Sequence, residues 1–472
     1  MNINEQIQNI RAQNILTSTP QERRAGNYLG NAFEKLTLQS PFKGHNPRTI
    51  GIEAEFSLVH SDLSPIDESL RDQIIDDANL LSNERGGLFS FQPELGAFQI
   101  EANQEEIFSQ GFSPDKMVEL FTWLDDCLVD AANDKGASVL KMGLHPTLEL
   151  NNIVRTSKPK YEQVPNHHIE NRVEDSFVLM EELGLEEEPD ATVVSACNSI
   201  QFNMSATSPE EAVDLVNWSI QMSPFLVAIT GNSRFAEGVD TGWNEPRNRL
   251  WDMTHLTETG HRVFLPDGFF DDVEDVFEHM AKHPLILEPS NEFEALAIAT
   301  GTNWLASKLK FITDEDLDIE RLLVEFRPIS TQQSPEANAA AMTLSIGRLL
   351  WALENEEPLL DFEAVENNSS QAQKLGLDGK FTVSEKVGDN WEIREVSGWE
   401  MRDIEIRKAI EGLVATGSGD TAEIEAFFKE NLAEMEPSRV LLQKLEDEGG
   451  IENKQVLKDV LINVLSANKI LT

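Results

Sequence analysis

The most informative stretch of the sequence is TIGIEAEFSLV, residues 49–59, in which apolar residues alternate with small or acidic ones. Alternation with a period of two is typical of a β-strand with two unlike faces. One face carries Ile50, Ile52, Ala54, Phe56 and Leu58. Glu53 and Glu55 lie on the other face, roughly 6.5 to 7 Å apart along the strand. The pair predicts either the solvated face of an edge strand or two carboxylates that bind cations.

Three later segments repeat the alternation: GAFQIEANQ at 96–104, CNSIQFNMS at 197–205 and LLVEFRPIS at 322–330. Their polar faces carry Gln99, Glu101, Asn103, Ser199, Gln201, Asn203, Ser205, Glu325 and Arg327. Solvent-facing strands are usually rich in Thr, Lys and Ser, whereas these faces offer Glu, Gln, Asn and Arg without a lysine. The set indicates a ligand-binding face, with an ordinary half-exposed sheet as the alternative.

The types of side chain on these faces point to one kind of chemistry. Carboxylate and amide oxygens suit hard cations such as Mg²⁺ or Mn²⁺, and Mg²⁺ commonly joins one or two carboxylates to substrate phosphates. An arginine beside them suits phosphate oxygens. The sequence has no P-loop, no G-x-G-x-x-G, no H-E-x-x-H and no G-x-S-x-G. If phosphate is bound, metal ions and arginines on a sheet must hold it.

Composition narrows the possible partners. The 83 acidic and 38 basic residues give a formal net charge of −45, which argues against nucleic acid and anionic membrane surfaces as partners. Cys127 and Cys197 lie in apolar contexts and predict buried thiols in a reducing compartment. The N-terminus has no apolar signal core, and no apolar run reaches the ~20 residues of a membrane span. We expect a cytoplasmic protein, and the acidic surplus suits a saline cytoplasm.

The chain divides into three predicted regions: a helical segment at 1–40, a catalytic domain at 41–357 and a helical region at 358–472. Ser208 and Ser334 are each followed by proline and acidic residues, which predicts helix starts directly after two of the strands. From about 358 the sequence turns acidic with helical apolar spacing. The predicted fold class is therefore α+β.

Six segments carry a resemblance to a known family: GIEAEF, ELGAFQIEAN, GLHPTL, CNSIQFNMS, NSRFAEGVDTGWNEPRNRLW and VEFRPIS. In this order, over roughly 49–350, they resemble the glutamate–cysteine ligase and carboxylate–amine ligase family (GCS2-like), relatives of glutamine synthetase. The resemblance implies an antiparallel sheet curled into a funnel with helices on its outer face. It also implies that the inner face binds ATP and two or three Mg²⁺ or Mn²⁺ ions.

The resemblance assigns roles to individual residues. It implies one ion bound by Glu53, Glu94 and Glu101, and a second bound by Glu55, Gln201 and Glu325. Family members place His or Gln at the position of Gln201, and Arg327 faces the transferred phosphoryl group. The expected contacts to substrate or nucleotide are Arg247, Arg249, His145 and Asn203. A structural ion pair is the alternative for the two arginines, and a turn residue is the alternative for His145. Lys158, Lys160 and Tyr161 are expected in a loop over the site.

The activity implied is ATP-dependent amide formation through an acyl phosphate. Glutamate and cysteine are the expected substrates, giving γ-glutamylcysteine in glutathione biosynthesis. Two alternatives stay open: a ligase of the same fold with another acid or amine, and a non-catalytic nucleotide-binding regulatory module. The partners expected are small molecules, and the sequence predicts no oligomeric state.

Overall fold

The computed structural model describes most of the 472 residues. The described residues are 20–38, 48–104, 107–108, 112–159, 161–163, 183, 191–255, 263–283, 285–388, 390–432, 435–448 and 455–460. Of the predicted N-terminal segment, 1–19 and 39–40 lie outside the described residues, and helix α2 covers Pro20–Leu38. Lys160 also lies outside them.

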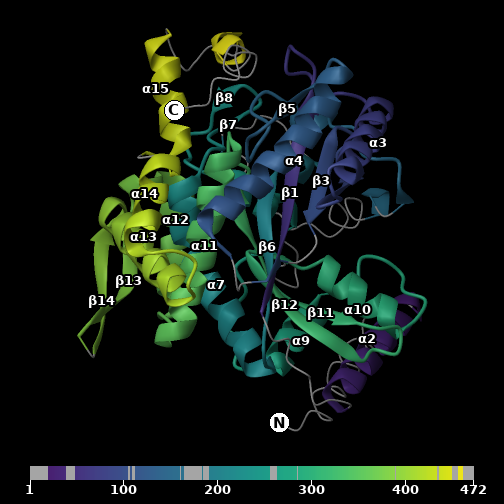
Figure 1. Cartoon of the computed structure of the whole chain (residues 1–472). Coiled ribbons are helices and arrows are strands. Elements are labelled where there is room, and N and C mark those ends of the chain that lie inside the picture. The colour runs from purple at the N-terminus through teal and green to yellow at the C-terminus, as the bar shows by residue number, and fades with distance from the viewer. Residues whose placement is uncertain are drawn as a thin grey trace.

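An antiparallel sheet of eight strands forms the centre of the molecule (Figure 1). Its strands run in the order β11-β12-β6-β1-β3-β2, and β4 and β5 pair with β1 beside this path. The strands are β1 (Thr49–Val59), β2 (Phe89–Pro93), β3 (Gln99–Gln104), β4 (Ile107–Phe108), β5 (Ser138–Leu140), β6 (Ser199–Ser205), β11 (Ser307–Thr313) and β12 (Ile319–Ser330). All four segments predicted as strands from their alternation are strands of this sheet, so the predicted α+β class is confirmed.

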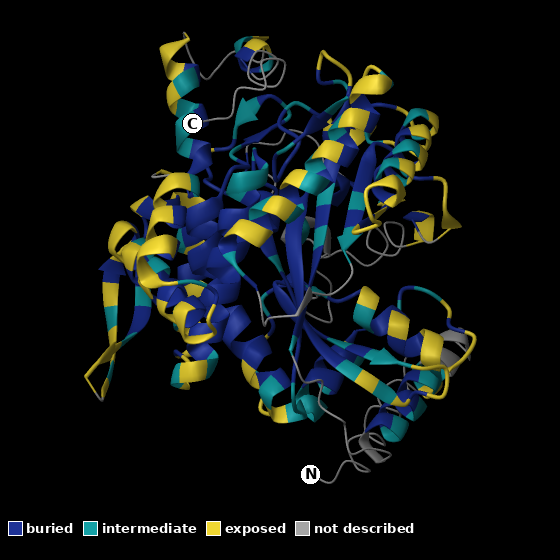
Figure 2. Ribbon diagram, in the orientation of Figure 1, coloured by how far each residue is buried: buried dark blue, intermediate teal, exposed yellow. Residues whose placement is uncertain are grey.

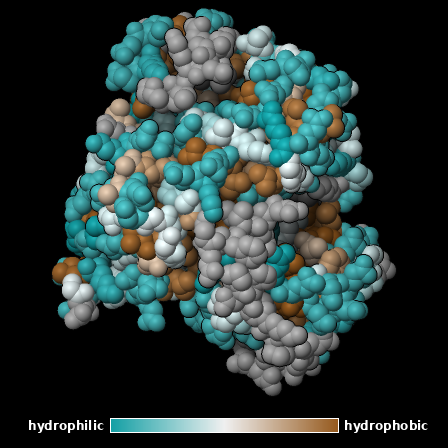
Figure 3. Space-filling model, in the orientation of Figure 1, coloured by the Kyte–Doolittle hydropathy of each residue, from teal (hydrophilic) through white to brown (hydrophobic). Residues whose placement is uncertain are grey.

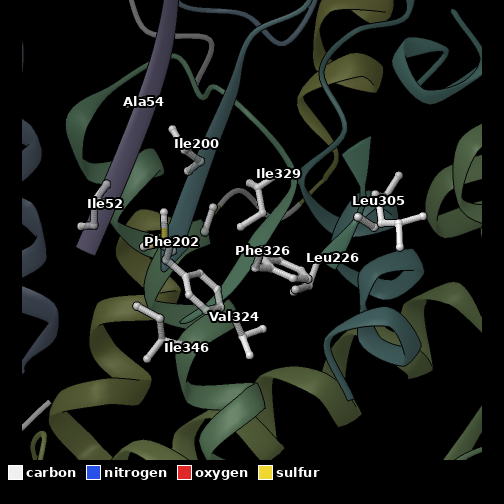
Figure 4. Close-up of a cluster of buried hydrophobic side chains, with 14 of the residues drawn as sticks. Ile52, Ala54, Ile200, Phe202, Leu226, Leu305, Val324, Phe326, Ile329 and Ile346 are labelled. Atoms are coloured by element: carbon white, nitrogen blue, oxygen red, sulfur yellow. The ribbon is translucent and has the colours of Figure 1, made fainter. Parts of the chain in front are cut away.

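The apolar face of the sheet packs against two long helices, α7 (Pro209–Thr230) and α11 (Pro335–Asn355). Figure 4 shows side chains of β1, β6 and β12 gathered with Leu226 of α7 and Ile346 of α11. Phe202 and Phe326 lie on adjacent strands with their ring centroids 5.2 Å apart. This packing buries the apolar set of the alternation and so fixes which face of each strand carries the acids.

Both long helices begin as the sequence predicts. The side chains of Ser208 and Ser334 accept hydrogen bonds from the backbone N–H of Glu211 and Ala337, at 3.1 Å each. Proline follows each cap at the first helical position, where its missing N–H costs nothing. Among the described residues, α7 alone has the length and apolar composition of a membrane span, but it lies almost wholly inside the molecule as a core helix (Figure 2).

Further helices surround the sheet. At one end lie α3 (Glu68–Glu84) and α4 (Pro114–Asp134), and at the other lie α2, α9 (Val273–Lys282) and α10 (Glu292–Gly301) (Figure 1).

Between them, α8 (Arg247–His255) and the short paired strands β9 (Val263–Phe264) and β10 (Trp304–Leu305) face the polar side of the sheet. The short hairpin β7 (Phe235–Ala236) and β8 (Val239–Asp240) precedes α8. Three 3-10 turns cover Leu150–Asn152, Ala191–Ala196 and Gly376–Asp378. Hydrophilic residues cover most of the face in Figure 3.

The sequence predicts a helical C-terminal region, and the structure shows helices there together with a β-hairpin. The region contains α12 (Phe362–Leu375), α13 (Gly398–Ala415), α14 (Thr421–Asn431) and α15 (Pro437–Asp447), but also an antiparallel hairpin of β13 (Lys380–Val387) and β14 (Asn390–Ser397). The hairpin is mostly exposed, so its outward charged residues mask the alternation of Phe381, Val383 and Val396, which are buried. The many charged residues of this region made the period-two pattern of β13 and β14 difficult to recognise in the sequence.

Helix α13 packs closely on α11 across the boundary predicted at residue 357. A Cβ on Gly347 of α11 would lie 2.6 Å from the carbonyl oxygen of Ala409 in α13, so only glycine permits this approach. Arg348 also donates to Glu357 at 2.6 and 2.8 Å and to Glu405, all with buried side chains. The domain boundary at residue 357 stays a prediction, and the buried ion pair between Arg348 and Glu405 crosses it.

Candidate active site

The polar face of the sheet brings the predicted acids together. In the strand register, Glu55 lies opposite Glu101, and Glu53 lies opposite Gln201. On the next strand pair, Glu325 lies opposite Asn203. Cβ atoms of directly opposed residues are ~4.5–5.5 Å apart, so like charges at such positions repel each other. Of these three pairs, Glu55 with Glu101 joins two acids, so a cation close to that pair would be stabilising.

Glu55 is held at the centre of this face by three donors. Its Oε2 accepts from the backbone N–H and the hydroxyl of Ser199 at 2.8 and 2.9 Å, and its Oε1 accepts from Nε2 of Gln201 at 2.9 Å. Burial raises the pKa of Glu55 to about 7, against the lowering effect of nearby Arg327. A carboxylate that is fixed in place and costly to ionise is suited to binding a cation.

Glu53 and Glu325 share a lysine that reaches them from β11. Nζ of Lys310 lies 3.2 Å from Oε1 of Glu53 and 3.2 Å from Oδ1 of Asn203, and it contacts Glu325 directly. A second lysine, Lys308, lies opposite Glu325 in the register, with its Nζ 3.3 Å from the carboxylate. Burial alone would raise the pKa of Glu325, but the two lysines and Arg327 hold it well below its usual value.

Arg327 lies at the junction between these groups. Its Nη1 donates to Oε1 of Gln201 at 3.0 Å and to the carboxylate of Glu325. Among the described residues both of these bonds use Nη1, so Nε and Nη2 remain for a ligand. Burial would lower the pKa of Arg327, but Glu325 and Glu55 raise it, so the guanidinium stays charged.

A cavity of about 430 Å³ lies over this face and is lined by Glu55, Glu94, Ser199 and Arg327. Its opposite wall is apolar and contains Trp251, Val263, Phe264, Leu287, Ile298, Trp304 and Leu305. The indole rings of α8 and β10 in this wall are tilted against each other, with centroids 5.6 Å apart. A ligand here meets charged groups on one side and a hydrophobic surface on the other, as in typical small-molecule sites.

The structure places most of the predicted site residues on this face or in this cavity. Glu55, Glu94, Arg247 and Arg327 line the cavity, and Tyr161 lines it as well. Glu53, Glu101, Gln201, Asn203 and Glu325 lie on the same sheet face. In the register of β1 against β3, Glu55 lies opposite Glu101 and Glu53 lies opposite Asn103, and Glu53 shares Lys310 with Glu325. The division of the acids between two ions that the resemblance implies stays a prediction.

Three of the predicted contact residues have other surroundings. Arg247 lines the cavity, but its terminal nitrogens donate to the carbonyl oxygens of Asn198, at 3.0 Å, and Pro328, so it ties β6 to β12. Arg249 is not among the lining residues and stacks over the indole of Trp243, 5.6 Å from its centroid.

His145 is not a lining residue either. It is completely buried, with its ring edge-on to Phe98, and burial lowers its pKa to about 4. The turn before Pro146 carries this side chain into the core, so we correct the expectation that His145 contacts substrate.

Sequence reasoning missed the two lysines of β11. Lys308 and Lys310 alternate with Leu309 and Phe311 in SKLKFIT, which is the same period-two signal as in the acidic strands. The four predicted strands contain no lysine on their polar faces, but a fifth strand adds two. The alternation of lysine with apolar residues in SKLKFIT was the signal that could have identified β11 as a strand with a polar face.

Metal binding fits one end of the site better than the other. The described residues contain no group of three His, Cys, Asp or Glu side chains that could hold a metal ion alone. The opposed carboxylates of Glu55 and Glu101 still fit Mg²⁺, which binds one or two carboxylates together with substrate phosphates. We call Glu55, Glu101 and Glu94 together the Glu55 end of the site. At the Glu53 end, formed by Glu53 and Glu325, the ammonium of Lys310 already lies between the carboxylates.

Comparison with known proteins identifies the family. The sequence profile described as glutamate-cysteine ligase family 2 matches residues 49–414, which is most of the chain. The chain belongs to this family. It is 24% identical over 349 residues to a protein of Bordetella avium (strain 197N) named "Putative glutamate--cysteine ligase 2", and the match covers 73% of each chain.

Solved structures support the fold of this family member. The crystal structure of a glutamate–cysteine ligase from Francisella tularensis, in complex with AMP, matches at a TM-score of 0.53 and 11% identity. The match covers 91% of this chain and 90% of that one. At this identity the likeness concerns the fold, and it confirms the curled antiparallel sheet with helices on its outer face. The match of the family profile also continues past residue 357 into α13.

Proposed function

We propose that this member of glutamate-cysteine ligase family 2 is an ATP-dependent carboxylate–amine ligase that joins the side-chain carboxylate of glutamate to the amino group of cysteine. The observation that supports this most is the placement of Arg327. Its guanidinium is fixed by Glu325 and Gln201 at the wall of the cavity, close to the carboxylate of Glu55. A fixed guanidinium beside a cation-binding carboxylate is an arrangement suited to phosphoryl transfer.

The reaction proceeds in two steps. An oxygen of the glutamate side-chain carboxylate attacks the γ-phosphorus of ATP, the bond to the β-phosphate breaks, and ADP leaves. The amine nitrogen of cysteine then attacks the carbonyl carbon of the acyl phosphate. The bond from this carbon to the phosphate oxygen breaks and inorganic phosphate leaves, and the nitrogen releases a proton to solvent, so an amide remains.

The residues of the chain stabilise charge during the first step. Nε and Nη2 of Arg327 are in position to donate hydrogen bonds to phosphoryl oxygens, because Nη1 is engaged by Glu325 and Gln201. Donors that are already oriented need no reorganisation as charge develops, which is the main source of such stabilisation. The apolar wall with Trp251 and Trp304 excludes water, which strengthens these interactions and limits hydrolysis of the acyl phosphate.

Divalent cations have a defined place in this proposal. Glu55, with Glu101 and Glu94, would hold Mg²⁺ or Mn²⁺, which when bound neutralises phosphate oxygens. Glu55 itself is kept in position by Ser199 and Gln201. Ser199 supplies both its backbone N–H and its hydroxyl, so it fixes the carboxylate in one orientation whether or not a substrate is present.

Trapping the acyl phosphate tests the function. The full chain is incubated with ATP, Mg²⁺, hydroxylamine and single amino acids, and hydroxamate and ADP are measured. We expect both products with glutamate and neither with the variant Arg327→Met. Hydroxamate with a different acid would keep the ligase and replace its substrate. If no acid in a broad panel gives hydroxamate while ATP binding is measurable, the chain is a nucleotide-binding module instead.

A further inference from the structure

The Glu53 end of the site contains a lysine where a metal ion would otherwise be expected. Nζ of Lys310 lies within 3.2 Å of Oε1 of Glu53 and Oδ1 of Asn203, and it contacts the buried carboxylate of Glu325. A carboxylate oxygen from each of two strands and an amide oxygen from a third surround this one ammonium group. Such an oxygen set resembles the donor set of a hard cation.

Local charge favours the lysine over a divalent ion at this end. Glu53 and Glu325 contribute two negative charges, whereas Lys308, Lys310 and Arg327 contribute three positive charges within contact distance. The carboxylates of Glu53 and Glu325 are therefore already neutralised by side chains, so a divalent ion would have to displace a lysine. At the Glu55 end, Glu55 lies opposite Glu101 and lines the cavity together with Glu94, and Arg327 is a cation close to Glu55.

The exposure of the side chains also suits a resident lysine at this end. The side chain of Lys310 is 24% exposed, compared with 1% for Glu325, so the ammonium contacts a carboxylate that is itself almost wholly buried. Lys308 is placed differently, because its Nζ donates to the carbonyl oxygen of Thr300 at 3.1 Å and contacts Oε1 of Glu325, whereas Lys310 contacts Oε2.

We propose that Lys310 is a built-in cation of the Glu53 end, so that divalent ions bind only at the Glu55 end and this protein needs one divalent ion fewer than its carboxylates suggest. The proposal deepens the proposed function and rests on it, since that function is what requires divalent ions. Lys310 then acts as a positive charge beside Glu325, the carboxylate that also contacts Arg327.

The number of bound ions tests the proposal. Mn²⁺ is titrated into the full chain without nucleotide, and free Mn²⁺ is followed by electron paramagnetic resonance. We expect Lys310→Met to bind one more Mn²⁺ per chain than the natural protein. Lys310→Arg, which keeps the charge, should bind the same number as the natural protein. The control Lys380→Met removes an exposed lysine of β13 that is paired with Glu395, and it should change nothing.

A second pair of variants keeps the proposal testable if Lys310→Met does not fold. Glu53→Gln should leave the number of bound Mn²⁺ unchanged, because Lys310 and not Mn²⁺ neutralises Glu53. Glu55→Gln should lose one Mn²⁺. Equal counts for the natural protein and Lys310→Met, or loss of an ion in Glu53→Gln, would overturn the proposal. The number of bound Mn²⁺ ions can be measured without turnover. If the hydroxamate assay fails but the numbers of bound ions are as expected, the proposed ligase activity is wrong and the proposed role of Lys310 is supported.

Discussion

Replacing Arg327 with lysine should reduce turnover strongly while leaving ATP affinity nearly intact. The guanidinium uses Nη1 for both Gln201, at 3.0 Å, and Glu325, which leaves Nε and Nη2 for the phosphoryl group. A lysine keeps the charge beside Glu325, but its single ammonium would be engaged by the same two partners. The substitution therefore removes donors that matter when charge develops on the phosphoryl oxygens.

The size of the effect follows from the number of donors lost. Removal of one preorganised donor to a developing oxyanion costs about 10²–10³ in kcat, or ~2.7–4 kcal/mol. Two donors of Arg327 are at stake, so we expect a loss of at least about 10³ in kcat for Arg327→Lys. Because lysine still pairs with Glu325, the free energy of unfolding should change little.

The assay is ADP release at varied ATP, with glutamate and cysteine saturating. A fall confined to kcat identifies a contact made mainly in the transition state, whereas a rise in KM at constant kcat identifies plain ground-state binding. Arg394→Lys is the control, since Arg394 of the distant hairpin pairs with Glu385 of the same hairpin and with Glu400 of α13. An unchanged kcat for Arg327→Lys would refute the role of this guanidinium in the phosphoryl step.

Three further predictions concern the acid, the buried histidine and the helix contact. Glu55→Gln should abolish ADP release but leave the circular dichroism spectrum intact, because it removes a charge and no apolar packing; normal turnover with Mg²⁺ would contradict the cation site. His145 has its pKa lowered to about 4 from its usual 6.5, so the unfolded state binds more protons between these values and stability falls as pH drops through them. Because His145→Leu cannot bind this proton, its free energy of unfolding should fall by about 3 kcal/mol less than that of the natural protein between pH 7 and pH 4, as measured by urea unfolding. Its kcat at neutral pH should be unchanged. If the pH dependence of stability is the same in both proteins, His145 does not lie in the core. Gly347→Ala should lower the free energy of unfolding by about 1–3 kcal/mol, since the methyl meets the carbonyl of Ala409 at 2.6 Å. Gly301→Ala, which meets nothing within 4 Å, is the matched control, and equal effects of the two would show that α11 and α13 are not in close contact.

The alternation of apolar and acidic residues was sufficient to predict four strands and the face on which their acids lie. The reason is physical, since burial against α7 and α11 permits only one choice of face. The helix starts at Ser208 and Ser334 could also be predicted, because the hydrogen bond of a capping serine and the proline that follows it lie within one turn of helix.

Features that depend on several distant segments could not be predicted in this way. The pairing of Glu55 with Glu101 depends on the register of β1 and β3, which alternation alone leaves open by steps of two residues. The reach of Lys310 to Glu53 depends on the curl that brings β11 toward β1, strands separated in the sheet by β12 and β6. His145 could be a ligand or a core residue until its surroundings at Phe98 were known.

The transfer of oxygen from substrate to phosphate tests the central claim most directly. Glutamate labelled with ¹⁸O in its side-chain carboxylate is incubated with the full chain, ATP, Mg²⁺ and cysteine, and the released phosphate is analysed by mass spectrometry. If an acyl phosphate forms, the carboxylate oxygen stays with the phosphate when cysteine attacks the carbonyl carbon. We therefore predict one ¹⁸O atom in each phosphate released. Unlabelled phosphate, released in step with the amide product, would contradict the proposed mechanism.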